Sequence, residues 1–272
     1  MTQPLVPDTR VEEAEWYTAA LAGFGGRVEC VVPRGYPAYA RILHRAGRPR
    51  SGSVRWAEVA AATGRVLHPL AQFASLAGRW QYERRVGLGW PGENPDEGTL
   101  DLDQLRELCR ILAAHTTSAE HCWLTVWEGW GNLPSAWPRS YPRIRQPHRA
   151  YFLFQRPLDE VVDFSIAIDS LHEESSSSAG YLVSTSSAET AADTPPVPTA
   201  APPVRLQSPS QWWPADRAWA VATEIDFDST LVAGSEALVQ EIVDDAELEA
   251  FRVESTDDLT AAGDTVNPGP AY

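Results

Sequence analysis

The sequence contains no lysine, and all 22 of its basic residues are arginine. This absence excludes mechanisms that need a lysine amine, such as a Schiff base, a lysine general base or a P-loop that binds phosphate through its lysine. Methionine occurs only once. Together with the heavy use of alanine, glycine, proline and valine, the missing lysine indicates coding bias in a high-GC genome rather than a selected chemical property.

Cysteine and long apolar runs are also scarce. Cys30, Cys109 and Cys122 are odd in number and lack CxxC spacing, so we expect buried thiols in a reducing compartment rather than disulfides or a zinc site. No stretch approaches the roughly 18 consecutive apolar residues of a membrane-spanning helix, and the first residues show no signal-peptide pattern. We therefore expect a cytoplasmic protein with no membrane partner.

Positive charge is nearly absent from the second part of the chain. Residues 157–272 hold 3 arginines against 22 acidic residues, whereas residues 1–156 hold 19 arginines against 15 acidic residues. The acidic total argues against nucleic acid as a partner, because phosphate contacts need clustered positive charge. The asymmetry fits either an acidic surface that binds a partner or two parts of one fold that attract each other.

The residues that are abundant predict a packed core. Apolar residues make up 43% of the chain and aromatic residues 10%, including 11 tryptophans. Strands and helices alternate only in part, which favours an α+β fold with a single central, largely antiparallel sheet, flanking helices and a long disordered internal loop. Expected strands cover 27–32, 38–44, 122–128, 150–154, 218–225 and 230–232, and expected helices cover 53–62, 69–78, 101–115, a short segment from Pro157, and 236–245 with Ser235 as its cap.

The block from Trp212 to Gly234 bears most on the domain organisation. It follows a tract rich in serine, threonine, alanine and proline that has no apolar face and is therefore expected to be disordered. Units of about forty residues without cysteine or a metal site rarely fold alone. We therefore expect an N-terminal lead-in (1–26), one α+β domain made of 27–170 and 211–253, a disordered loop between them (171–210), and an acidic flexible tail (254–272).

Three alternating carboxylates form the first candidate site. Glu224, Asp226 and Asp228 would share one face of an extended chain and could bind a divalent cation or act as an acid/base pair. The alternative is an Asp-rich turn whose side chains cap backbone amides and stay solvated. We favour the turn because the block offers no histidine or cysteine to complete a site. No catalytic residue and no cofactor are predicted.

Tryptophan-rich turns form the second candidate site. Trp127, Glu128 and Trp130 lie in one short turn, with Trp123 just before them, and Trp212 and Trp213 begin the late block. Tryptophan faces beside an acid can make a platform for a sugar or an aromatic ligand. A tight strand-end turn with tryptophans at its rim is the plainer interpretation. The glycine-rich segment 23–26 (GFGG) fits neither a GxGxxG motif nor a P-loop.

Five blocks of the chain together resemble uncharacterised Trp-rich proteins of high-GC actinobacteria. The blocks are GYPAYARILH (35–44), RWAEVAAATGRVLHPLAQF (55–73), CWLTVWEGWG (122–131), AYFLFQRPLD (150–159) and WWPADRAWAVATEIDFDSTLVAGS (212–235). The resemblance implies one fold across most of the chain and brings no activity, cofactor or catalytic residue with it.

These observations favour a non-enzymatic binding or interaction module, regulator-like or immunity-like, that presents an aromatic and acidic surface to a protein partner or a small ligand. The alternative is a carboxylate-based hydrolase or metal-dependent enzyme centred on Glu224, Asp226 and Asp228. The two differ in geometry, because an enzyme needs these side chains to converge in a pocket with a third functional group.

Overall fold

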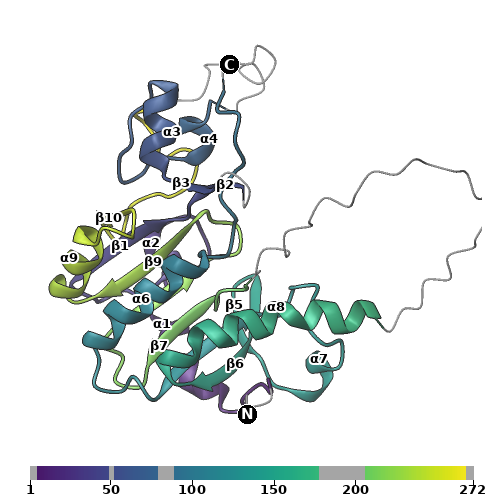
Figure 1. Ribbon diagram of the computed structural model, residues 1–272. Coiled ribbons are helices and arrows are strands. Elements are labelled where there is room, and N and C mark those ends of the chain that lie inside the picture. The colour runs from purple at the N-terminus through teal and green to yellow at the C-terminus, as the bar shows by residue number, and fades with distance from the viewer. Residues whose placement is uncertain (1–4, 49–51, 79–88, 178–205, 268–272) are drawn as a thin grey trace, which may run out of the picture.

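An eight-stranded sheet, antiparallel at every pairing, forms the centre of the molecule (Figure 1). The computed structural model describes residues 5–48, 52–78, 89–177 and 206–267. The strand order across the sheet is β10-β1-β9-β8-β7-β4-β6-β5. The strands are β1 (Ala38–Leu43), β4 (Cys122–Trp127), β5 (Ile144–Gln146), β6 (Arg149–Arg156), β7 (Gln211–Pro214), β8 (Ala220–Thr223), β9 (Ser229–Gly234) and β10 (Ala250–Val253).

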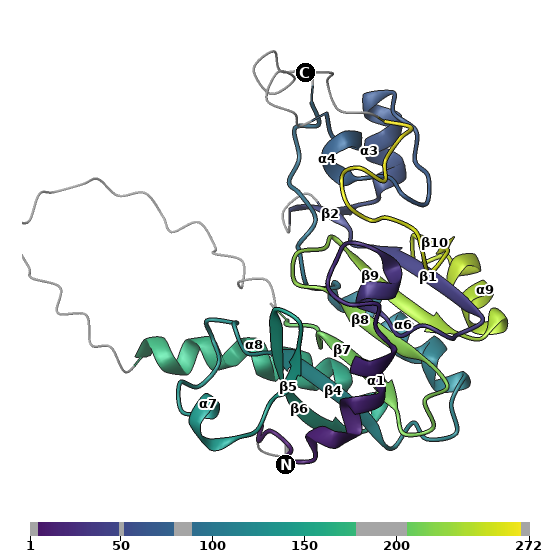
Figure 2. The same cartoon turned by 180° about the vertical axis from the view of Figure 1, so that it is seen from behind.

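Helices cover both faces of this sheet. Because side chains alternate along a strand, Leu124 of β4 faces one helical layer while the neighbouring Trp123 faces the other. The first layer holds α6 (Leu102–Ala114), η2 (Leu158–Glu160), α8 (Val161–Ser177) and α9 (Glu236–Asp244), of which α6 and α8 lie in front in Figure 1. The second layer, seen in Figure 2, holds η1 (Val11–Ala14), α1 (Glu15–Ala20) and α2 (Val28–Val31).

A small lobe packs beyond the C-terminal end of strand β1. It consists of the two-stranded sheet β2 (Ala46–Arg48) and β3 (Gly52–Val54) with α3 (Trp56–Thr63) and α4 (Phe73–Leu76). Its core is built around Trp56, which is fully buried against Leu43 of β1. The remaining short helix, α7 (Trp137–Ser140), precedes β5 and buries Trp137 against the edge of the main core. The described helices include none with both the length and the apolar character that crossing a bilayer requires.

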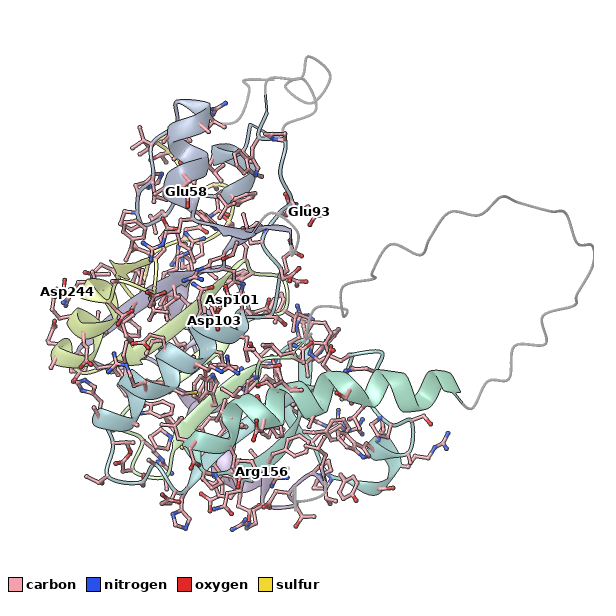
Figure 3. All side chains as sticks on the ribbon, in the orientation of Figure 1. Glu58, Glu93, Asp101, Asp103, Arg156 and Asp244 are labelled. Carbon is pink, nitrogen blue, oxygen red and sulfur yellow. The ribbon has the colours of Figure 1, made fainter. Side chains whose placement is uncertain are left out.

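Local sequence explains the best-formed helices. The Asp101 carboxylate at the start of α6 (labelled in Figure 3) accepts a hydrogen bond from the backbone N–H of Gln104 at 2.9 Å, and Leu105, Leu108 and Leu112 repeat at helical spacing on the buried face. Ser235 caps α9 in the same way, since its hydroxyl accepts from the N–H of Leu238 at 3.1 Å. Both predicted helix starts are confirmed.

The block that begins at Trp212 lies in the middle of the sheet. Strand β9 pairs with β1 over six residues on one side and with β8 on the other, and β7 joins β8 to β4. Strands from both sides of the 171–210 tract therefore share one sheet. The α+β fold with a largely antiparallel central sheet, predicted from the sequence, is confirmed.

Residues 27–32 are not the strand that the sequence predicted. They form the single helical turn α2, because Val28, Val31 and Val32 follow helical spacing and all three pack onto the sheet. Glu29 and Cys30 lie between them and are less buried. Six residues are too few for the apolar period to separate a strand from a helix turn.

The helix boundaries in the small lobe also differ from the prediction. Ser53 lies in β3, so α3 starts at Trp56, and its first two N–H groups donate to the Glu249 carboxylate, Trp56 N at 2.7 Å and Ala57 N at 2.9 Å. This cap comes from a distant part of the chain and leaves no local signal. The helix expected from Pro69 begins only at Phe73.

Parts of the expected loop and of the expected tail are ordered in the described residues. Helix α8 continues to Ser177, and Gln207, Ser208 and Ser210 are buried, so only residues 178–205 of the predicted loop lie outside the described residues. The segment 254–267, expected to be flexible, instead packs on the body with Leu259, Asp264 and Asn267 buried. The lead-in is likewise part of the fold, because Ala14 and Tyr17 are buried against the sheet.

Candidate functional site

A pocket of about 250 Å³ opens on the sheet face that α1 and α2 cover. Five segments that are distant in the sequence line this pocket. They are the loop between α1 and α2, the β5–β6 hairpin, the start of β7, the turn between β8 and β9, and Thr260 of the C-terminal segment. Antiparallel pairing sets Gln211 opposite Ala222 and Gln146 opposite Arg149, which brings the strand ends together at the pocket. The pocket therefore depends on the pairing of β5 with β6 and of β7 with β8.

An arginine shared by two carboxylates is the main polar feature of the pocket. Arg149 Nε donates to Glu224 Oε1 at 3.3 Å, and Arg149 Nη2 donates to Asp226 Oδ2 at 2.7 Å. The side chains of Arg149 and Glu224 are each 17% exposed, whereas that of Asp226 is 71% exposed. The backbone N–H of Asp226 also donates to Glu224 Oε2 at 2.6 Å. Glu224 is thus the enclosed carboxylate and Asp226 the solvated one.

Aromatic rings fix the position of the Arg149 guanidinium. Its central carbon lies 5.3 Å from the ring centre of Phe24 and 5.6 Å from that of Trp127, which are cation–π distances. The Phe24 ring also lies 4.8 Å from the imidazole of His148. Although Phe24 is 57% exposed, it is held in place at the mouth of the pocket by these two neighbours.

The backbone at His148 is in the left-handed region, with φ at 62°. Pro147 and His148 form the two-residue turn between β5 and β6, and a positive φ at its second position is typical of glycine or asparagine. Such a conformation costs about 1–2 kcal/mol for a residue with a side chain. Strain of this kind gathers at functional sites, and here it presents the imidazole to Phe24.

Burial shifts the proton affinities of two groups in the pocket. Burial raises the pKa of the Glu224 carboxyl above its ordinary value, against the opposing effects of the Asp226 N–H and the Arg149 charge. Burial, and then the negative charge of Glu224, raises the pKa of the Tyr151 phenol. For Glu224, the contacts with Arg149 and with the Asp226 N–H therefore do not fully offset the cost of burying its negative charge.

A reciprocal amide pair closes the pocket beside these charges. Gln146 Nε2 donates to Gln211 Oε1 at 2.9 Å, and Gln211 Nε2 donates to Gln146 Oε1 at 3.0 Å. The pair links β5 to β7, two strands that are not neighbours in the sheet. It therefore fixes the spacing between the hairpin and the sheet centre.

The glycine-rich segment 23–26 forms the pocket wall opposite the turn between β8 and β9, a role that the sequence did not reveal. Leu259 N donates to Gly26 O at 2.9 Å, and a Cβ on Gly26 would lie 2.1 Å from Thr260 Cγ2. A side chain at position 26 would therefore require the Thr260 side chain to move. The available signal was one glycine before Phe24 and two after it, a pattern that matches no nucleotide-binding motif.

The three carboxylates singled out from the sequence separate into two groups. Glu224 and Asp226 meet at Arg149, whereas Asp228 lies 3.5 Å from the buried guanidinium of Arg41. Two of the carboxylates thus share a guanidinium, and the third pairs with another. Within the described ranges, no three histidine, cysteine, aspartate or glutamate side chains come together as a cation site would require. The metal-site hypothesis gains no support from this arrangement.

The candidate tryptophans serve mainly as core residues. Trp123, Trp212 and Trp213 are at most 7% exposed, and Trp213 packs against Trp16 and Tyr17 on the α1 face. Trp127 and Trp130 are half-buried and meet edge to face at 5.8 Å, while Glu128 pairs with Arg143. Among the six ligand-surface candidates, Trp127 touches the pocket region directly, through its contact with Arg149. Their role in ligand binding stays a prediction.

The arrangement can enclose a small molecule and hold it by charge, hydrogen bonds and aromatic contact. The described lining residues include no histidine, so Cys30 has no imidazole base beside it, and both carboxylates already bond Arg149. Among the described lining residues, the pattern of a nucleophile beside its base is therefore not found. Comparison with known proteins adds no family, since no protein-family model, no curated protein and no solved structure matches this chain.

Proposed function

We propose that this chain is a binding module that holds a small organic ligand in the pocket between α1–α2 and the turn that joins β8 to β9. One observation carries the proposal, namely that an enclosed carboxylate and an arginine face an apolar cavity walled by five separate segments. Mostly apolar pockets with a few placed polar groups are the common form of ligand sites. The strained turn at His148 and the exposed ring of Phe24 support the same interpretation.

This proposal narrows the interaction role expected from the sequence to a small ligand. A hydrolase built on Glu224 and Asp226 has less support, because Arg149 binds both carboxylates and no further base lies among the described lining residues. A general acid also needs its partner base free to activate water. The binding role needs no such second group.

A fragment screen against the purified chain tests the proposal. Hits would be detected by NMR chemical-shift changes and repeated on Cys30→Trp, which places a large side chain in the pocket from α2. The matched control is Val66→Trp, since Val66 is 56% exposed and does not line the pocket. Hits should bind the unmodified chain and the control and be lost in Cys30→Trp, with all three proteins showing the same melting behaviour. Hits that persist in a folded Cys30→Trp protein would place the binding site elsewhere.

A further inference from the structure

We propose that the ligand of this pocket is an organic monocation, a protonated amine on a small apolar body, and that Glu224 is its counter-ion. The inference rests on the proposed function and specifies the ligand's chemical class. It draws on the balance of charges in the lining, on the unused acceptor positions of Glu224, and on the aromatic walls.

The charge balance of the lining favours a cation. The described lining residues carry two carboxylates, Glu224 and Asp226, and one guanidinium, Arg149. The shorter of the two ion pairs is with the solvated Asp226, at 2.7 Å, and the longer is with the enclosed Glu224, at 3.3 Å. One negative charge is thus left over, and it resides on the carboxylate that water reaches least.

Glu224 has room for further hydrogen bonds. Its Oε2 accepts from the N–H of Asp226 and its Oε1 from Arg149 Nε. An ionised carboxylate offers about four acceptor positions, so about two remain for the N–H groups of an ammonium. Charge-assisted hydrogen bonds of this kind are about twice as strong as neutral ones.

The walls suit a cation with an apolar body. Phe24, Tyr151 and Phe227 line the pocket, and aromatic ring faces attract ammonium groups. Leu21, Val31 and Ile225 also line it and can contact hydrocarbon. The volume of about 250 Å³ lies just below the range of about 300–1,000 Å³ typical of pockets for drug-sized ligands, so the ligand is small.

An anionic ligand fits the same walls less well. To reach Arg149 it would have to displace Asp226 or Glu224, and the displaced carboxylate would then repel it. Like charges brought together in this way disfavour binding. A cation instead adds a second positive charge beside two carboxylates that share the single guanidinium of Arg149.

The test compares three probes of similar shape and different charge, 2-phenylethylammonium, 2-phenylethanol and 3-phenylpropanoate, by NMR titration of the whole chain at pH 7. The ammonium should bind at least tenfold more tightly than the other two probes. Glu224→Gln should weaken ammonium binding at least tenfold and leave binding of the alcohol unchanged. The matched control is Glu236→Gln, because Glu236 is also an arginine-paired carboxylate but lies outside the pocket, on Arg252. It should change nothing.

The outcomes separate this inference from the proposed function. Equal or tighter binding of 3-phenylpropanoate, or unchanged ammonium binding in Glu224→Gln, would overturn the cation assignment. In that case, loss of probe binding in Cys30→Trp would still support a ligand pocket. Failure of all three probes together with an empty fragment screen would refute both. If Glu224→Gln does not fold, Asp226→Asn replaces it, and it should weaken ammonium binding by a smaller factor because Arg149 is then free to pair with Glu224 alone.

Discussion

Replacing Asp264 by alanine is expected to detach the C-terminal segment 254–267 from the small lobe. The Asp264 side chain is fully buried, and of its four shortest hydrogen bonds two come from the loop before α4 and two from backbone N–H groups of its own segment. The donors are His68 Nε2 at 2.8 Å, Gln72 N at 3.0 Å, Val266 N at 3.2 Å and Asn267 N at 2.8 Å.

The size of the loss follows from the groups left without a partner. A buried donor without an acceptor costs about 1–3 kcal/mol, and three backbone N–H groups would lose theirs. If the segment stayed in place, the loss would reach about 3–9 kcal/mol in total. Because the segment can leave and hydrate those groups, the loss is limited to the free energy of detachment. We therefore expect about 2–4 kcal/mol.

The contribution of Asp264 to stability also has a defined pH dependence. Burial acts to raise its pKa, but the hydrogen bonds from Asn267, Gln72 and His68 outweigh that effect and lower the pKa below the ordinary 3.8. A carboxyl whose pKa is lower in the folded state stabilises the fold above its unfolded pKa. The difference between Asp264→Ala and the unmodified chain should therefore be full above about pH 4 and vanish as the pH falls through the lower, folded value.

Urea unfolding and amide hydrogen exchange together measure this effect. Asp264→Ala should lower the unfolding midpoint and speed exchange across 254–267, while the strands of the sheet keep their protection. Asp257→Ala is the matched control in the same segment, because Asp257 accepts a single exposed bond from Glu254 N at 2.8 Å. Unchanged exchange at Asn267 in the Asp264→Ala protein would refute the reasoning. Since Thr260 lines the pocket, ligand binding should weaken in the same variant.

Three further predictions concern the pocket and the sheet. The folded-state pKa of Glu224 is raised above 4.5, so ionising this carboxyl destabilises the fold as the pH rises past 4.5. Glu224→Gln should therefore be more stable than the unmodified chain at pH 7 in urea unfolding, and this difference should disappear at pH 4. Phe24→Ala should change stability by less than about 0.5 kcal/mol, because the side chain is 57% exposed, yet weaken binding of an ammonium ligand about two- to fivefold in the NMR titration. Separately produced pieces 1–190 and 191–272 should co-purify as a one-to-one complex, since β9 pairs with β1 over six residues; a C-terminal piece that folds alone would contradict this.

Much of the sheet could be predicted from the sequence because its strands carry strong local signals. The β-branched and aromatic run at Cys122–Trp127 and the capped, striped helix from Leu102 needed no tertiary information. The turn at Val28–Val31 did, because a run of six residues fits two periods and its packing partner, Leu259, lies far along the chain. Likewise, the α3 cap comes from Glu249, which no local pattern links to Trp56.

The candidate site was only partly predictable, for a related reason. Glu224 and Asp226 stood out by their alternation, but the residue that gives them their role, Arg149, is 75 positions away from Glu224 and meets it through the sheet order. Trp212 and Trp213 begin the late block in the sequence and are core residues in the fold. Sequence shows which residues can do chemistry, whereas the pairing of strands decides which of them meet.

The uneven charge of the chain has a structural explanation in these pairings. Cations of the first part bind carboxylates of the second part at several places, as in the pairs Arg110–Asp245, Arg41–Asp228 and Arg149–Glu224. Of these pairs, only Arg110–Asp245 has an exposed partner, and a surface pair of that kind is worth about 0–1 kcal/mol. Arg41 pairs with one acid, whereas Arg110 and Arg149 each pair with two. At the pocket one guanidinium meets two acids, and the enclosed carboxylate keeps a charge that the fold itself does not balance. A cationic ligand would supply the missing charge at the point where the two parts of the chain meet.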